Sequence, residues 1–185
     1  RALGATVLSG HTALEPIVQR GFVRGATIAP DIGEQHDIRA AFLVVADGAN
    51  SRFGRLLGTH REPTWPSAVA HRAVFRSQLH DAAEVELVLD LRDRAGTMIT
   101  GYGWMFPRGD GTVNVGVLMF STSPSFRVIN AAHLLEQFVA DQRHRWRLDG
   151  PPVQQPAGGR LPLGGSVGPA AGPTYLVVGD AAGVA

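Results

Sequence analysis

Two aspartates follow short apolar runs, each beside a glycine, and these residues are the best placed in the sequence to bind a ligand. Asp47-Gly48 follows residues 42–46, and Gly179-Asp180 follows residues 175–178. Glycine lets the backbone approach a ligand closely, and the free N–H groups at a helix start bind phosphate. An aspartate beside such a turn accepts hydrogen bonds from sugar or ribityl hydroxyls. The alternative is that both aspartates merely cap the helices that follow them.

The runs before the two aspartates predict short strands, and the residues after them predict helix starts. Residues 42–46 are continuously apolar, which suits a strand buried on both faces, and residues 49–58 predict a short helix ending at Gly58. Residues 175–178 predict a second buried strand. Ligands bind outside the carboxyl ends of strands in open α/β sheets. Together, the two turns therefore favour a cofactor site over simple capping.

The rest of the chain predicts strands, one longer helix and one long connection. The further predicted strands are residues 5–9, 14–20, 22–29, 68–77, 85–91, 97–107 and 112–120. The last four predict an antiparallel sheet, with Asp110-Gly111 as a hairpin turn. Residues 131–141 predict a helix capped by Asn130, with an apolar face of Leu134, Leu135, Phe138 and Val139. Residues 150–173 predict a long Gly/Pro-rich loop, a type of segment that is usually functional or disordered.

Composition excludes several classes of protein. The 185 residues are 44% hydrophobic and 18% charged, which is enough to form a core and too little charge for a disordered chain. The absence of cysteine excludes disulfides, thiolate metal sites and a thiol nucleophile. All 17 basic residues are arginine, so no P-loop or Schiff-base lysine exists. A net charge of +1 gives no electrostatic case for nucleic acid, and the seven histidines show no metal-ligand spacing.

The sequence around both turns resembles FAD-dependent aromatic hydroxylases and their relatives. Residues 44–55, VVADGANSRFGR, look like the Asp-Gly motif of that family, and residues 175–183, YLVVGDAAG, look like its Gly-Asp motif. The resemblance implies that Asp180 accepts a hydrogen bond from the ribityl chain of FAD and that Asp47 lies near the pyrophosphate. The FAD-binding residues implied in this way are Asp47, Gly48, Asn50, Ser51, Arg52, Gly179, Asp180, Ala181, Ala182 and Gly183.

One position departs from the hydroxylase pattern. That pattern has an arginine seven residues after the motif aspartate, whereas this chain has Gly54 there, between Arg52 and Arg55. The departure argues against hydroxylase-type handling of a pyridine nucleotide.

A middle segment is similar to the Tyr-x-Trp-x-Phe-Pro segment of geranylgeranyl reductases and menaquinone reductases. It is formed here by Tyr102, Trp104, Phe106 and Pro107, and in that branch it lines the isoprenoid cavity near the flavin. Residues 158–162, 167–169 and 172–175 also resemble this branch. The three aromatic residues share one face of a strand by alternation. Such stripes are more typical of a packed core, so core packing stands as the alternative to cavity lining.

The resemblance implies a mixed α/β (α+β) fold. An FAD-binding Rossmann-like domain would comprise residues 1–62 and 158–185, and an inserted antiparallel β-sheet substrate domain residues 63–157. The implied reaction is reduction of an isoprenoid C=C bond, in a menaquinone side chain or a geranylgeranyl lipid, by hydride transfer from reduced FAD. The alternatives are an FAD-dependent monooxygenase or halogenase, or a non-catalytic fragment. Tyr102 is the candidate proton donor, against a favoured role as a packed aromatic. The electron donor would be NAD(P)H or a ferredoxin-like protein.

The family normally opens with a Gly-x-Gly-x-x-Gly turn for the ADP half of FAD, and the start of this chain lacks it. We therefore expect an internal fragment of a longer FAD-dependent oxidoreductase, inactive by itself. Without an apolar run of about 18 residues or a signal peptide, a cytoplasmic location is expected. The basic cluster of Arg143, Arg145 and Arg147 predicts a solvated helix end, with peripheral contact at the inner face of the membrane as the minority alternative.

Overall fold

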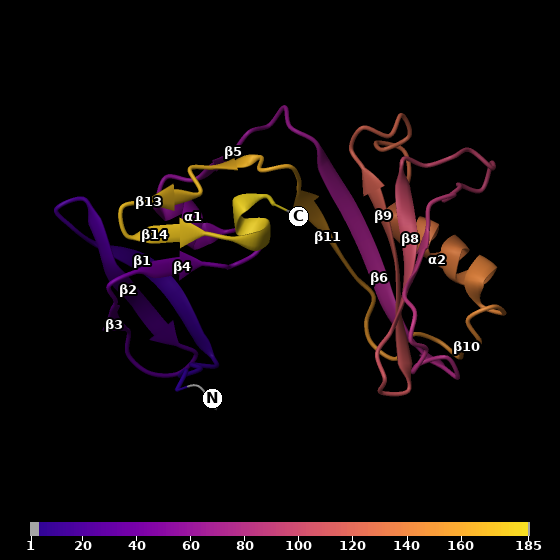
Figure 1. The fold of residues 1–185 in the computed structure, drawn as a ribbon, viewed down its shortest axis with the longest axis horizontal. Helices are drawn as coiled ribbons and strands as arrows, with labels where there is room; N and C mark the ends of the chain where they lie inside the picture. The colour runs from indigo at the N-terminus through magenta and orange to yellow at the C-terminus, as the bar shows by residue number, and fades with distance from the viewer. Residues whose placement is uncertain (1–3, 185) are drawn as a thin grey trace. The chain divides into compact units, whose positions relative to one another are not determined.

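The computed structural model describes residues 4–184 and divides the chain into two compact units. One unit contains the residues up to Trp65 together with those from Pro162 onward, and the other spans Pro66–Leu161. The sequence placed the two divisions after residues 62 and 157, a few residues earlier in each case. Both units combine strands with a helix, so the predicted mixed fold class is confirmed (Figure 1).

The first unit consists of short strands and two short helices. Its strands are β1 (His11–Gln19), β2 (Phe22–Pro30), β3 (His36–Arg39), β4 (Leu43–Val45), β5 (His60–Arg61), β12 (Val167–Gly168), β13 (Ala171–Gly172) and β14 (Tyr175–Val177). Its helices are α1 (Arg52–Leu56) and the 3-10 helix η1 (Gly179–Ala182). Strands β1, β2 and β3 form an antiparallel sheet, β5 pairs with β12, and β13, β14 and β4 form a third sheet.

A small core holds β4 and β14 against the two short helices. Val45, Val177 and Phe53 are buried there together with Ala181 and Ala182. The opposite face of the two strands is open among the described residues, because Val44 is 59% exposed and its partner Leu176 is 51% exposed. The prediction that these strands are buried on both faces is therefore wrong. Only alternate residues face α1 and η1, so only those are covered.

The second unit is an antiparallel sheet with one helix packed on it. Its elements are β6 (Ser67–Ser77), β7 (Glu86–Val88), β8 (Gly101–Pro107), β9 (Thr112–Phe120), β10 (Leu148–Asp149), β11 (Ala157–Pro162) and α2 (Ala131–Gln142). The strand order is β10-β6-β9-β8-β7, and β11 also pairs with β6. Figure 1 shows α2 lying along one face of this sheet. The predicted antiparallel sheet and helix are confirmed.

Helix α2 and the sheet enclose the larger core of the molecule. The Asn130 side chain caps the helix by accepting the N–H of Ala132 at 2.8 Å, as the sequence predicted. The predicted apolar face is buried against the sheet. A Cβ at Gly103 would meet the Phe138 ring, so glycine at this position lets helix and strand approach closely.

Three predicted segments differ from the structure. Residues 5–8 form no strand. The strand predicted at residues 42–46 is shorter, since β4 spans only Leu43–Val45 and Phe42 before it is 74% exposed. The predicted loop 150–173 contains β11, β12 and β13, and the N–H of Val153 also bonds the carbonyl of Val74 at 2.8 Å. The partners of these three strands are β6, β5 and β14 respectively, and the sequence does not reveal these pairings. No described helix is long and apolar enough to cross a membrane.

Candidate functional site

The two aspartate turns lie side by side at one edge of a sheet. Strand β14 runs parallel to β4, with Val177 opposite Val45, and the N–H of Val178 donates to the carbonyl of Val45 at 2.9 Å. Both chains therefore leave their strands in the same direction and turn at the same carboxyl edge. This is the edge at which open α/β sheets bind ligands.

The Asp47 turn leads into a capped helix. Its carboxylate Oδ2 accepts the N–H of Phe53 at 3.1 Å, and the Ser51 hydroxyl accepts the N–H of Gly54 at 3.0 Å. Two of the N–H groups that a helix start leaves free are thus satisfied by side chains. For Asp47 the structure shows the capping role, which the sequence analysis weighed as the alternative.

Glycine at position 54 follows from this cap. A Cβ at Gly54 would lie 2.8 Å from the Thr59 hydroxyl and closer still to the Ser51 hydroxyl. Both hydroxyl-bearing residues are buried, so neither has room to move aside. The turn therefore has no space for the arginine of the hydroxylase pattern.

The Asp180 turn differs, because no N–H group of the described residues donates to the Asp180 carboxylate. Helix η1 has no side-chain cap, and Asp180 lies within its first turn. It is half-buried, and among residues 4–184 its carboxylate has no hydrogen-bond or ion-pair partner. Ala181 and Ala182 anchor η1 in the small core, so the carboxylate is held on a fixed helix.

Two glycines leave open space beside these turns. Gly48 has φ +80° and Gly179 has φ +60°, and a Cβ at either would meet no atom within 4 Å. An apolar cleft of about 240 Å³ lies next to Asp47 and includes Ala13 and Ala26 of β1 and β2. Sequence reasoning missed these two alanines, because β1 and β2 belong to a different sheet and only tertiary packing brings them close to β4.

The remaining predicted cofactor residues lie around the same edge. Asn50 is exposed, and its carbonyl accepts Nη1 of Arg55 at 3.0 Å. Arg52 is the exposed first residue of α1. Gly183 ends η1 with φ +67°, and a Cβ there would lie 2.9 Å from the Ser166 hydroxyl. The structure thus brings all ten predicted cofactor residues to the two turns.

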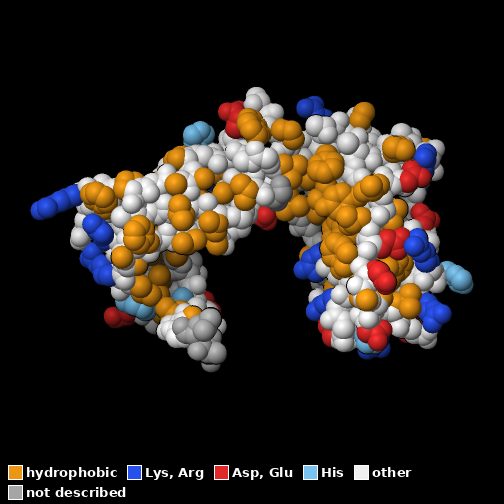
Figure 2. Space-filling view, in the orientation of Figure 1, with side chains coloured by type: hydrophobic (Ala, Val, Ile, Leu, Met, Phe, Trp, Pro, Cys, Tyr) orange, Lys and Arg blue, Asp and Glu red, His pale blue; other side chains and the backbone are white. Residues whose placement is uncertain are grey.

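The aromatic residues of the second unit lie on the sheet face opposite α2. The rings of Tyr102 and Trp104 are 6.2 Å apart, and those of Trp104 and Phe106 are 6.0 Å apart. None belongs to the core beneath α2, although Trp104 is only 8% exposed. Alternation places Pro107 on the other face, with Met105. Figure 2 shows apolar side chains gathered on the surface of this unit beside β6.

The Trp104 indole lies flat across the neighbouring strand. A Cβ at Gly116, its partner on β9, would overlap the indole ring. An open cleft of about 350 Å³ begins at Trp104 and crosses Ala70 and Arg72 of β6 to reach Gly158 and Gly159 of β11. The Tyr102 hydroxyl makes no hydrogen bond to the described residues. An apolar wall with room beside it can accept an extended apolar ligand.

Comparison with curated proteins finds relatives that match most of this chain. A menaquinone reductase of Mycolicibacterium smegmatis is 36% identical over 160 residues, which are 85% of this chain and 38% of that protein. A digeranylgeranylglycerophospholipid reductase of Methanosphaerula palustris is 34% identical over 122 residues, 62% of this chain and 28% of that protein. The chain thus spans well under half the length of these relatives. No family model matches it.

Solved structures show the same fold. A geranylgeranyl bacteriochlorophyll reductase-like protein of Thermoplasma acidophilum matches 93% of this chain and 41% of its own, with a TM-score of 0.68 and 24% identity. A flavin-dependent brominase matches 93% of this chain and 44% of its own, with a TM-score of 0.62 and 17% identity. The resemblance seen in the sequence is confirmed, since the chain is a homologue of part of the menaquinone and digeranylgeranylglycerophospholipid reductases.

Proposed function

We propose that this chain is part of an FAD-dependent oxidoreductase that reduces a C=C bond of an isoprenoid lipid. The observation that carries the proposal is the pair of turns at one sheet edge, in which Asp180 has no partner among residues 4–184 and the glycines leave space. A match to a menaquinone reductase over 85% of the chain supports the same reading. The isoprenoid would belong to a quinone side chain or a geranylgeranyl lipid.

The residues of the first unit fit the polar part of such a cofactor. The Asp180 carboxylate would accept a hydrogen bond from a ribityl hydroxyl, because no group of the described residues bonds to it. Gly48 and Gly179 would let the cofactor approach the backbone, because the space beside both is open. Asp47 would act indirectly, by holding the start of α1. When bound, reduced FAD would supply a hydride to one alkene carbon.

The aromatic face of the second unit would hold the apolar chain of the substrate. Tyr102, Trp104 and Phe106 present an apolar wall that the α2 core does not use. Saturating an unactivated alkene depends on close positioning more than on acid strength, and a rigid wall supplies positioning. Tyr102 is the candidate donor of the proton that the other alkene carbon needs, because its hydroxyl makes no hydrogen bond to the described residues.

The proposal is tested with the full gene product, FAD and dithionite, which replaces the natural electron donor. Menaquinone and a geranylgeranyl lipid are supplied separately, and each lipid is examined by mass spectrometry. After any quinol is reoxidised in air, a gain of two mass units, from two hydrogens added across one side-chain double bond, is expected for one of them. No gain in either lipid would overturn the assigned reaction. A Tyr102→Phe variant with unchanged turnover would remove Tyr102 as the proton donor and leave the rest intact.

A flavin-dependent monooxygenase or halogenase is the second candidate, favoured by the fold match to the brominase. Substrate-dependent oxygen consumption with an oxygenated or halogenated product would support it. The occupation of position 54 by glycine, with no room for an arginine, argues against the hydroxylase branch.

A further inference from the structure

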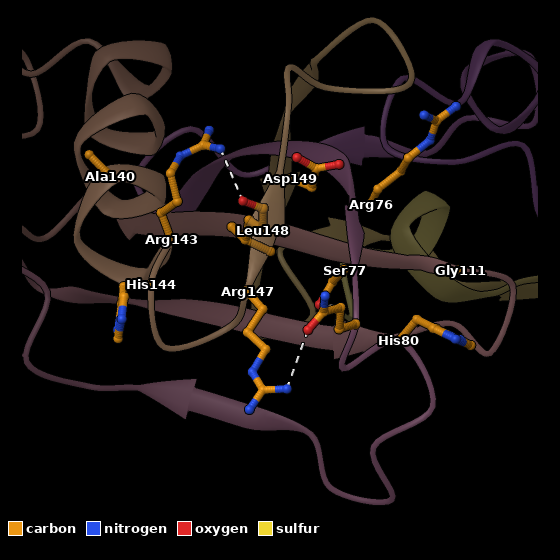
Figure 3. A pocket seen from close by; sticks show the side chains of 11 residues that line it. Arg76, Ser77, His80, Gly111, Ala140, Arg143, His144, Arg147, Leu148 and Asp149 are labelled. Atoms are coloured by element: carbon orange, nitrogen blue, oxygen red, sulfur yellow. Dashed lines mark hydrogen bonds between the residues drawn. The ribbon is translucent and has the colours of Figure 1, made fainter.

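A second cleft lies in the sheet-bearing unit, at the end of α2, and the proposed function does not use it. Its volume is about 1080 Å³. Figure 3 shows Arg143 and His144 projecting from the end of α2, Arg76 from β6, and Arg147 from the turn before β10. Small-molecule sites have volumes of roughly 300–1,000 Å³, so this space admits more than a single inorganic ion.

The charged side chains of this cleft are mostly cationic. Arg76, Arg143 and Arg147 line it together with a single carboxylate, that of Asp149. Within residues 4–184 none of these three arginines forms an ion pair, whereas Arg39, Arg92, Arg108 and Arg145 each pair with a carboxylate. Three guanidinium groups beside one carboxylate leave the cleft with a net positive charge, which attracts anions.

Arg143 is held in place by the backbone around it. Its Nη1 donates to the carbonyls of Leu148 at 3.1 Å and Gly150 at 3.2 Å. Its guanidinium carbon lies 5.7 Å from the centre of the Phe75 ring. A guanidinium has five N–H donors in a fixed fork, so donors remain for a ligand, and the group is ordered before the ligand arrives.

Arg147 and His80 show two further features typical of binding sites. Arg147 has φ +46°, a strained conformation for a residue with a side chain, and such strain clusters at functional sites. The Nδ1 atom of His80 is shielded from solvent and has no hydrogen-bond partner among the described residues. Buried polar atoms normally have a partner, so His80, a residue that lines the cleft, departs from that rule.

We propose that this cleft binds the phosphate or diphosphate group of an organic anion. Guanidinium groups bind phosphate oxygens through paired hydrogen bonds, and three unpaired arginines suit more than one negative charge. The volume leaves room for an organic group attached to the phosphate. A soluble phosphate ester and a phospholipid headgroup share this chemistry, so the experiment needs one arm for each.

The first arm titrates the full gene product with inorganic pyrophosphate by isothermal calorimetry. The double variant Arg76→Gln/Arg147→Gln removes two exposed cations of the cleft, and we expect its Kd to rise at least tenfold. The matched control is Arg92→Gln/Arg145→Gln, which removes the same charge from arginines paired with Asp90 and Glu86 outside the cleft. Its Kd should stay within twofold of the parent protein.

The second arm measures co-sedimentation with phosphatidylglycerol vesicles and with phosphatidylcholine vesicles. Binding to phosphatidylglycerol alone that the cleft variant loses and the control keeps would identify a lipid headgroup, and pyrophosphate binding without vesicle binding would identify a soluble ester. The proposal is overturned if neither probe binds, or if both double variants lose binding equally. Should circular dichroism show that the cleft variant is unfolded, Arg76→Gln alone replaces it, because Arg76 is exposed and makes no side-chain bond to the described residues.

Discussion

Asp47 and Asp180 follow neighbouring parallel strands at the same edge of a sheet. Only the Asp47 carboxylate accepts a hydrogen bond from the described residues. Asp47 accepts the N–H of Phe53 at 3.1 Å. Asp180 has no partner among residues 4–184. Both are acidic, both lie beside a glycine, and both precede a buried residue of a short helix. Residue type and topological place therefore do not decide which carboxylate is available to a ligand.

The position of each aspartate relative to its helix explains the difference. Asp47 precedes α1, which begins at Arg52, so its side chain can reach the free N–H groups at the helix start. Asp180 lies inside the first turn of η1, which begins at Gly179, and no side chain caps η1. In this chain the aspartate before its helix accepts a helix N–H, and the aspartate within the first turn has no partner among residues 4–184.

The largest effect is expected from adding a methyl group on the capped side. Gly54→Ala would press a Cβ against the hydroxyls of Ser51 and Thr59. Overpacking and loss of a cap should together lower the free energy of unfolding by about 3 kcal/mol, as measured by urea denaturation. The control is Gly159→Ala, whose Cβ would meet no atom within 4 Å. Equal stability of the two variants would contradict the packing argument.

The next effect separates the two aspartates by function. Asp180→Ala should weaken FAD binding by about 30-fold, because a hydrogen bond to a charged group contributes about 2 kcal/mol. The free energy of unfolding should stay within about 0.5 kcal/mol, as for a residue without a partner. FAD fluorescence titration and urea denaturation of the full gene product give the two readouts. A stability loss without an affinity loss would reverse the roles assigned to Asp47 and Asp180.

Sequence patterns predicted the parts of the molecule that depend on local chemistry. The Asn130 cap, the buried face of α2 and the 112–120 strand all follow from neighbouring residues, and all three are confirmed. The turns at Asp47 and Asp180 were located for the same reason, since each has its glycine beside it.

The parts that the sequence did not predict depend on which strands pair. Val44 and Leu176 are exposed because β4 and β14 form a sheet that is packed on one face, and an apolar run cannot show how many faces are covered. Residues 150–173 form strands because β6, β5 and β14 offer edges with which they pair. The sequence also could not decide whether the Asp47 carboxylate caps α1, because capping depends on where α1 begins, within a residue or two.

A smaller effect tests the cap itself. Asp47→Ala leaves the N–H of Phe53 without its acceptor, and loss of a cap costs about 1 kcal/mol of unfolding free energy. Asp47→Asn keeps a side-chain oxygen and should retain most of that stability. Urea denaturation of both variants and of Asp180→Ala compares the contributions of the two aspartates to the free energy of unfolding. If Asp47→Ala and Asp180→Ala prove equally stable, the proposed difference between the capping carboxylate of Asp47 and the unpartnered one of Asp180 is wrong.

The smallest effect concerns Asp110, a turn aspartate whose carboxylate accepts a hydrogen bond from the Thr112 hydroxyl. A hydrogen bond from the Thr112 hydroxyl, helped by the nearby Arg108 guanidinium, holds the pKa of the Asp110 carboxyl below its ordinary value of 3.8. Because the folded pKa is the lower one, this contribution to stability is fully present above the ordinary pKa. It is lost as the pH falls through the folded pKa.

The change should be small, because the group is exposed and screened by solvent. A carboxyl carbon NMR titration should therefore find the Asp110 midpoint below 3.8, and Thr112→Val should raise it toward that value. The matched control is Thr64→Val, which removes a hydroxyl bonded to Glu62 in the other unit and should leave Asp110 unchanged. If Thr112→Val leaves the Asp110 midpoint unchanged, the hydrogen bond from Thr112 does not lower the pKa of this carboxyl. A hydrogen bond seen in a turn would then not show that a carboxylate is stabilised by it. The same doubt would then extend to the bond between Asp47 and Phe53, on which the contrast with Asp180 rests.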